Sequence, residues 1–461
     1  MPLEAIGRLK EVVKKLHAVE VELVRYRSAS SAPDAGKIPE DWHNILQSSD
    51  KQDYETQRYL LHTCVNGEIC EDDPSSPLLL SPKNKRRFGS NTSWTVDPAI
   101  TLSSQVQDLV AKAGHIDFDA LELAKCPEVN GKPIHFAGRQ LMVRDGLLDS
   151  LAEVNCVADN DLFQQRVLKF LGEVDGLYLK DTIYHGSPHG ADAMSSVSWF
   201  MRFPFMQART HSLDTFLGLI AAAVHDIGHP GTSNAFQCQT MTSLALRYND
   251  KSVLENHSIA LTFETMFGRE SLDWFSLVSR EFEFSNGSPM VNLQQYSRRA
   301  LIGMVLATDM TQHAKAISQV KNFLNDESAA KTPQDGAQES MERKLLLLET
   351  VLHAADLSNP CRPRKIMLSW TKRVLQEFWA QGDEERRRGL PISPLCDRAS
   401  GMATVAKGQL GFIKFVIHPY LNPIVELMPG AKEASTQLAE NTAFWEERDK
   451  NQEGYDQIFT E

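Results

Sequence analysis

The stretch FLGLIAAAVHDIGHPGTSN, residues 216–234, joins a run of small apolar residues directly to a histidine–aspartate pair. Residues 212–225 have the apolar spacing of a buried helix that ends at His225 and Asp226. Two ionisable groups at the end of an apolar helix are unfavourable unless a partner compensates them. A divalent metal would compensate both, since imidazole nitrogen and carboxylate oxygen are common metal ligands. The stretch therefore predicts a metal site at a helix end.

Two segments far away in the sequence also place possible metal ligands at the end of a predicted helix. In YHGSPHGAD, residues 184–192, Ser187 is predicted to cap a helix that Pro188 begins, which places His189 in its first turn and His185 before it. In KLLLLETVLHAAD, residues 344–356, Asp356 closes an apolar helix. Two ions about 4 Å apart in such a mixed nitrogen–oxygen site would polarise a phosphoryl group and generate hydroxide. The donor types suit Zn²⁺ beside a harder Mg²⁺ or Mn²⁺, and His185 is left free to act as an acid or base.

Most of the other histidines lack such neighbours. A lone histidine near a helix end is more often a capping or core residue than a ligand. We interpret eight histidines in this structural way: His17, His43, His62, His115, His135, His211, His353 and His418.

Helical periodicity dominates the chain from about residue 105 onward, and strand-like alternation is nearly absent. The sequence therefore predicts an all-α catalytic domain over residues 105–455. The segments with 3.6-residue apolar spacing are 105–113, 137–153, 159–173, 212–225, 236–248, 253–267, 297–324, 339–356, 364–380 and 401–417.

The N-terminal part differs in composition. Residues 1–27 carry Ile6, Leu9, Val13 and Leu16 at helical spacing, which predicts an amphipathic helix that packs on its own domain or forms a homodimer. Residues 28–104 are rich in Ser, Asn, Pro and Asp, which predicts a polar, disordered linker.

Composition narrows the class of protein. The 461 residues are 42% hydrophobic, which excludes global disorder, and the net charge of −12 argues against a nucleic-acid partner. The seven cysteines are widely spaced and odd in number, which favours free thiols in a reducing compartment. The longest strongly apolar run, residues 216–224, is too short to cross a membrane, and no signal-peptide pattern is present. We expect a soluble, cytoplasmic protein without an integral membrane span.

The motifs together resemble the catalytic domain of the class I 3′,5′-cyclic-nucleotide phosphodiesterases, which belong to the HD-type metallohydrolases. The resemblance runs from about residue 140 to 450. Besides the order His189, His225-Asp226 and Asp356, it rests on six blocks: HDIGHPGTSN (225–234), YNDKSVLENH (248–257), ATDMTQH (307–313), HAADLSNP (353–360), GLPISPLCDR (389–398) and QLGF (409–412).

The resemblance implies a compact bundle of about sixteen helices. It also implies an enzymatic activity. Cyclic nucleotides would be hydrolysed to 5′-nucleoside monophosphates by a metal-bridging hydroxide, with His185 as the general acid. The first metal, usually zinc, would be held by His189, His225, Asp226 and Asp356. The second, usually magnesium or manganese, would share Asp226. Residues that orient metal-bound water would be His229, Asn234, Glu255, His257 and Thr308. Residues that contact the substrate would be Tyr184, Met310, Asn359, Val374, Gln409 and Phe412.

The chain also departs from the family pattern. The family's first block usually reads YHNxxHAxDV, whereas this chain has Gly186 and Gly190 at the Asn and Ala positions. We expect Gly186 to loosen the backbone beside His185. Asn359 favours cAMP over cGMP, because members with Asn there tend to prefer adenine. Two alternatives are an HD-type phosphohydrolase acting on another nucleotide or phosphate ester, and a degenerate protein that only binds cyclic nucleotide.

Overall fold

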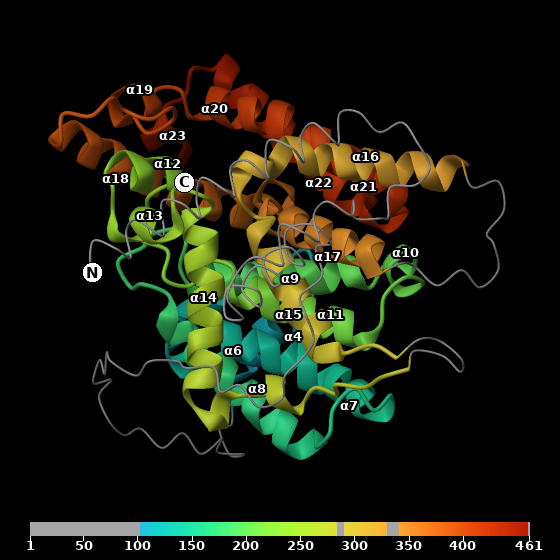
Figure 1. The fold of residues 1–461 in the computed structure, drawn as a ribbon. Coiled ribbons are helices and arrows are strands. Elements are labelled where there is room, and N and C mark those ends of the chain that lie inside the picture. Colours follow the sequence, from blue (N-terminus) through green and yellow to red (C-terminus); the bar gives the residue numbers. More distant parts are fainter. Residues whose placement is uncertain (1–101, 284–289, 330–340, 460–461) are drawn as a thin grey trace, which may run out of the picture. The chain divides into compact units, whose positions relative to one another are not determined.

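The computed structural model describes residues 102–283, 290–329 and 341–459 (Figure 1). All of them belong to one compact unit, Asp97–Glu461. The predicted N-terminal helix, its homodimer interface and almost all of the predicted linker lie outside the described residues. Within the described ranges there is no β-strand, only the isolated bridges Val157–Val278 and Phe282–Val291. The predicted all-α class is confirmed.

The described residues form twenty α-helices, α4 to α23, and eight short 3₁₀ or π segments. This number exceeds sixteen because helices of only four to seven residues are included. The longer helices are α4 (Ser104–Ala111), α8 (Asn160–Leu177), α9 (Ser187–Met201), α11 (Ser212–Val224), α14 (Val253–Gly268), α15 (Leu293–Leu306), α16 (His313–Ala329), α17 (Met341–Asp356), α18 (Arg364–Arg387), α20 (Val405–Phe412), α21 (His418–Leu427) and α22 (Lys432–Lys450).

The remaining α-helices are short. They are α5 (Ala120–Lys125), α6 (Pro133–Gly138), α7 (Leu147–Glu153), α10 (Pro204–Gln207), α12 (Asn234–Gln239), α13 (Ser243–Tyr248), α19 (Arg398–Gly401) and α23 (Tyr455–Phe459). The 3₁₀ segments are η1 (Pro127–Val129), η3 (Glu270–Leu272), η4 (Phe275–Leu277), η5 (Met310–Gln312), η6 (Asn359–Cys361) and η8 (Pro429–Ala431), and the π segments are η2 (Arg139–Arg144) and η7 (Ile413–Ile417).

Helices α9, α11, α15 and α17 form the centre of the described unit (Figure 1). Every residue of α11 from Phe216 to Val224 is buried, and nearly all of α9 is buried as well. Small side chains allow the two helices to approach closely, since a Cβ on Gly218 would lie 3.1 Å from a methyl of Val197. A second, smaller apolar cluster lies among α18, α20 and α22.

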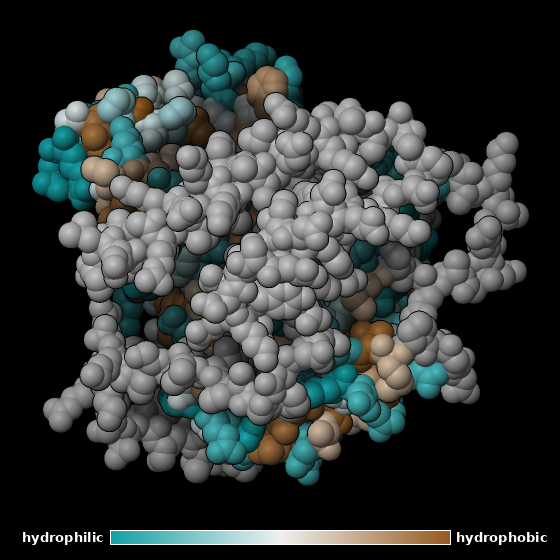
Figure 2. All heavy atoms as spheres, in the orientation of Figure 1, coloured by the Kyte–Doolittle hydropathy of each residue, from teal (hydrophilic) through white to brown (hydrophobic). Residues whose placement is uncertain are grey.

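The surface over α18 and α19 mixes hydrophilic and hydrophobic residues (Figure 2). Its charges are paired, for example Arg386 with Asp397 at 2.7 Å and Arg398 with Asp383 at 2.6 Å. Among the helices described, none combines the length and apolar character that a bilayer crossing requires.

Several predicted helices are interrupted where the backbone turns. The predicted helix 236–248 is divided into α12 and α13 at Met241, whose φ of +47° is left-handed. The predicted helix 297–324 is divided into α15 and α16, because the Asp309 carboxylate accepts from the N–H of Thr311 and caps η5. The predicted helix 137–153 breaks at Gly146, with a φ of +75°. Apolar spacing continues through each break, so periodicity alone could not locate them.

Candidate active site

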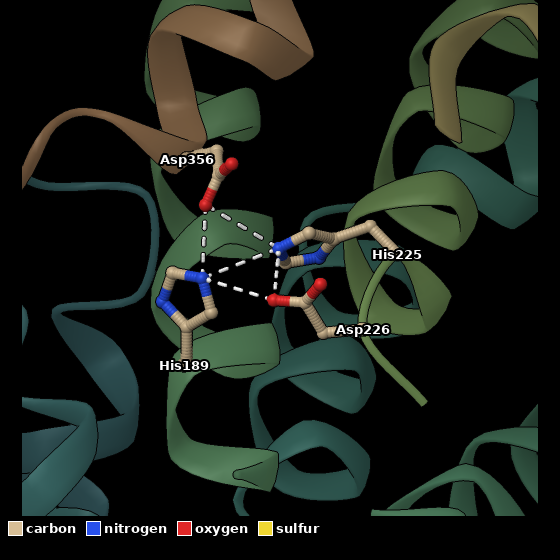
Figure 3. A group of neighbouring side chains, drawn as sticks. All are labelled: His189, His225, Asp226 and Asp356. Atoms are coloured by element: carbon tan, nitrogen blue, oxygen red, sulfur yellow. Dashed lines mark hydrogen bonds and ion pairs between the residues drawn. The ribbon is translucent and has the colours of Figure 1, made fainter. Parts of the chain in front are cut away.

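Three distant elements bring four predicted metal ligands together (Figure 3). His189 lies in the first turn of α9, His225 and Asp226 follow the last residue of α11, and Asp356 is the last residue of α17. One donor atom from each lies within 4.8 Å of all the others. The first turn of α9 differs in detail from the prediction, because Gly186 rather than Ser187 is the N-cap.

The donor geometry fits a metal ion. His189 Nε2 lies 3.2 Å from His225 Nε2 and 2.9 Å from an oxygen of Asp356, and His225 Nε2 lies 3.1 Å from an oxygen of Asp226. Ligands around a tetrahedral zinc lie about 3.3 Å apart, given metal–ligand distances of about 2.0–2.1 Å. His225 Nδ1 faces the Ala222 carbonyl at 2.8 Å, so this nitrogen carries the proton and leaves the Nε2 lone pair for a metal.

The charges of the cluster also suit a cation. His189 and His225 are each only 1% exposed. Burial would raise the pKa of Asp226 and Asp356, but the adjacent imidazoles hold the pKa of both carboxyls below the usual range. Two partly buried, ionised carboxylates beside two buried imidazoles form a donor set that suits a divalent cation.

A second group lies beside the first and contains His185, His229 and Glu377. Glu377, on α18, pairs through Oε1 with Nδ1 of His185. Its other oxygen accepts the backbone N–H groups of Ile183, Tyr184 and His185, at 3.0, 2.7 and 3.2 Å. Burial lowers the pKa of His185, but Glu377 and Asp226 outweigh it and raise that pKa to about 9. His185 is therefore held as a cation at neutral pH.

His229 has a different protonation state from His185. The two rings stack with centroids 3.8 Å apart, and the backbone N–H of Gly231 donates to Nδ1 of His229 at 3.0 Å. Burial and the neighbouring His185 lower the pKa of His229 to about 3. The ring is therefore neutral with its proton on Nε2, and its Nδ1 lone pair is already used.

The backbone around Gly186 is held in place, contrary to the expected loosening. Gly186 has φ −108° and ψ 176°, which any residue can adopt. Besides the three bonds to Glu377, the hydroxyl of Thr182 donates to the carbonyl of His185 at 3.1 Å. Anchoring from α18 therefore fixes the position of His185.

A cavity of about 260 Å³ adjoins the first group, since Asp356 is part of its lining. It is lined by Tyr184, Asn359, Val374, Gln409 and Phe412, which are five of the six predicted substrate contacts. The sixth, Met310, is 45% exposed on η5 and is not part of this lining. The lining also includes Trp370, whose ring packs edge-on against Tyr184 and His189 with centroids 5.6 and 5.9 Å apart.

Comparison with known proteins agrees with this geometry. The family described as 3′5′-cyclic nucleotide phosphodiesterase matches residues 184–438, which is more than half of the chain. The chain belongs to this family.

Curated relatives include the rat 3′,5′-cyclic-AMP phosphodiesterase 4C, 35% identical over 285 residues, which are 61% of this chain and 50% of that protein. A Drosophila melanogaster 3′,5′-cyclic-AMP phosphodiesterase, isoform F, is 32% identical over 280 residues, which are 60% of this chain and 40% of that protein. The matched region thus spans half or less of the length of these relatives.

Solved structures show the same fold. The phosphodiesterase domain of the RhoPDE fusion protein from the choanoflagellate Salpingoeca rosetta superposes with a TM-score of 0.62 and 24% identity, covering 75% of this chain and 98% of that one. LmjPDEB1 in complex with IBMX gives a TM-score of 0.61 with 24% identity, covering 76% of this chain and 99% of that one. At this identity the likeness concerns the fold alone.

The residues that the phosphodiesterase resemblance assigned to water orientation are buried or partly buried. The Asn234 amide donates to the Glu255 carboxylate at 2.9 and 3.1 Å and accepts the N–H of Leu254 at 2.9 Å. Burial raises the pKa of Glu255 to about 7. His257 packs against Gly228, where a Cβ would lie 2.8 Å from Nε2, and the hydroxyl of Thr308 donates to the carbonyl of Val305. Their roles stay predictions.

In this phosphodiesterase fold the amide of Asn359 is fixed on both sides. Its oxygen accepts the Tyr184 hydroxyl at 2.6 Å, and its nitrogen donates to the Asp192 carboxylate at 3.1 Å. Asp192 in turn pairs with Arg362 at 2.8 Å, and both are at most 2% exposed. Only one orientation of the Asn359 amide satisfies both partners.

Replacing Arg362 with methionine is expected to lower the free energy of unfolding by about 3–5 kcal/mol, because Asp192 would remain buried without its partner. Urea unfolding followed by circular dichroism measures the change. Arg387→Met, which breaks the exposed pair with Glu384, is the control and should leave the midpoint unchanged. Equal effects of the two substitutions would contradict a structural role for the buried pair.

Replacing Glu377 with glutamine is expected to move the alkaline limit of activity to lower pH. As a general acid, His185 would work only when protonated, so activity would fall as the pH rises through its pKa, about 9 in the intact site. Without the Glu377 charge, burial lowers that pKa, so activity at pH 8 should fall more than activity at pH 6. The profile of kcat/KM from pH 5.5 to 9.5 measures this shift, with the exposed Glu384→Gln as control.

Proposed function

We propose that the chain hydrolyses 3′,5′-cyclic nucleotides to 5′-nucleoside monophosphates, with cAMP preferred over cGMP. The observation that carries the proposal is the placement of a four-residue metal-type cluster, a cationic His185 and a 260 Å³ pocket side by side. Membership of the family indicates the class of reaction. That this chain itself carries out the reaction, and on which nucleotide, is our proposal.

The first metal, zinc, would be held by His189, His225, Asp226 and Asp356, and the second, magnesium or manganese, would share Asp226. When bound, two such ions supply Lewis-acid polarisation of the phosphoryl group and make water a better nucleophile at neutral pH. The protein contributes the fixed donor positions, and the pairing of His225 Nδ1 with the Ala222 carbonyl keeps its Nε2 aimed at the site.

His185 would protonate the leaving O3′ oxygen. Because Glu377 holds Nδ1, the Nε2–H of the protonated ring is the proton available to the substrate. As the P–O3′ bond breaks, its electron pair passes to O3′ and takes the proton from Nε2. Glu377, whose pKa lies near 2, stays ionised and favours reprotonation of His185.

Gln409, Phe412 and Val374 would bind the purine, with the amide of Gln409 at the base edge and the Phe412 ring on one face. The preference for cAMP is supported by the fixed amide of Asn359, which cannot reverse its donor and acceptor without losing Tyr184 or Asp192. The names of the matched relatives, both cyclic-AMP phosphodiesterases, point the same way.

Turnover of cAMP and cGMP by the purified chain tests the proposal. With Mg²⁺ and Zn²⁺ present we expect 5′-AMP as product and a higher kcat/KM for cAMP, and a chelator should abolish turnover until metal is restored. Binding without turnover would favour a degenerate binding protein. Hydrolysis of other phosphate esters, with cyclic nucleotides untouched, would favour a broader HD-type phosphohydrolase.

A further inference from the structure

The backbone carbonyls in the last turn of α11 need hydrogen-bond donors, and residues of the same segment supply only some of them. The last four carbonyls of a helix lack partners within the helix, and leaving one buried without a bond is unfavourable. The Ala222 carbonyl faces Nδ1 of His225 at 2.8 Å, and the Val224 carbonyl accepts the N–H of Ile227 at 3.3 Å. Between them, the Ala223 carbonyl accepts its bond from outside the segment.

That bond comes from Tyr178, at the end of α8. The Tyr178 hydroxyl donates to the Ala223 carbonyl at 3.0 Å, and the residue is only 5% exposed. One residue earlier, the carbonyl of Leu177 accepts the N–H of Gly228 at 3.1 Å. The end of α8 therefore holds the backbone on both sides of Asp226.

The same hydroxyl lies against α9. A Cβ on Gly190 would be 2.4 Å from the Tyr178 hydroxyl oxygen and 3.0 Å from its ring, too close for any side chain without movement. Gly190 directly follows His189 in the chain. The glycine that departs from the usual family block therefore leaves the space in which this hydroxyl lies.

We propose that Tyr178 is a positioning residue for the metal centre. Its hydroxyl holds the Ala223 carbonyl, just before His225 and Asp226, and on its other side fills the space beside His189, so that the ligands of α9 and α11 keep their separation. The inference rests on the proposed metal set, but it does not depend on which substrate is hydrolysed. Groups that orient ligands without touching the metal typically change metal affinity about 10–100-fold when removed.

Replacing Tyr178 with phenylalanine tests the proposal, because it removes only the hydroxyl. The full chain is stripped of metal and titrated with Zn²⁺ in competition with a chromogenic chelator. We expect the dissociation constant for Zn²⁺ to rise about 10–100-fold. The matched control is Tyr420→Phe, since the buried Tyr420 hydroxyl also donates to a backbone carbonyl, that of Thr350, at 3.0 Å. Zinc affinity of the control should stay within about twofold of wild type.

Gly190→Ala supplies a second variant, because its methyl group would displace the hydroxyl. It should weaken Zn²⁺ binding in the same direction, and combining it with Tyr178→Phe should change affinity by less than the two separate effects together. Unchanged zinc affinity in Tyr178→Phe, or an equal loss in Tyr420→Phe, would overturn the proposal. A chain that shows the zinc effect but hydrolyses no cyclic nucleotide would overturn the proposed function alone.

Discussion

Replacing Asp356 with alanine is expected to remove metal from the site and to lower cAMP turnover by about a thousandfold or more. Asp356 places one oxygen 2.9 Å from His189 Nε2 and 3.4 Å from His225 Nε2, so its removal leaves the four-residue cluster with the Asp226 carboxylate alone. Metal polarisation of a phosphoryl group is worth several kcal/mol, and each 1.36 kcal/mol is a tenfold change in rate.

Metal content of the purified variant and its kcat for cAMP measure this outcome. Glu342→Ala is the matched control, because Glu342 lies in the first turn of the same helix and makes an exposed pair with Arg299. It should keep the zinc content and the kcat of wild type. Wild-type metal content in the Asp356 variant would show that the ligand set is wrong.

Replacing His185 with alanine should lower kcat for cAMP about 10²–10⁴-fold while the zinc content stays at the wild-type level. The ring pairs with Glu377 and is not one of the four clustered donors, so its loss removes a proton donor and leaves the metal set in place.

A substrate with a better leaving group separates this role from simple damage to the site. With bis(4-nitrophenyl) phosphate the departing phenolate needs no proton, so the His185 variant should lose far less activity than with cAMP. His115→Ala, an exposed histidine outside the cavity, is the control and should retain both activities. Equal losses with both substrates would argue against proton donation, and loss of zinc would reassign His185 as a ligand.

The convergence of His189, His225, Asp226 and Asp356 could be predicted from sequence, because each lies at an end of a helix whose apolar run must be buried. The pairing of Glu377 with His185 could not be predicted, since the two are 192 residues apart and Glu377 is one of several acidic residues in an amphipathic helix. One signal was available: Glu377 lies three residues after Val374, on the face of α18 that was already expected to line the purine pocket.

Arg362 was missed for a different reason. The block HAADLSNP ends two residues before it, and a single arginine after a loop is usually solvent-exposed. Its burial beside Asp192 follows only from tertiary packing. The helix boundaries at Met241 and Gly146 were also not predicted. At both positions a residue with left-handed backbone interrupts an apolar pattern that continues beyond it.

The clustered donors are far apart in the sequence, and this has a consequence for the stability of the fold. His189 and Asp356 are 167 residues apart, so both reach one ion only when α9, α11 and α17 are already packed together. An unfolded chain offers no such site, and the proposed zinc would therefore bind the native state selectively. At a free concentration a thousandfold above its dissociation constant, such a ligand adds about 4 kcal/mol to the stability of the native state. Withdrawal of zinc should consequently make the whole helical domain, and not merely its catalytic cleft, easier to melt and to digest.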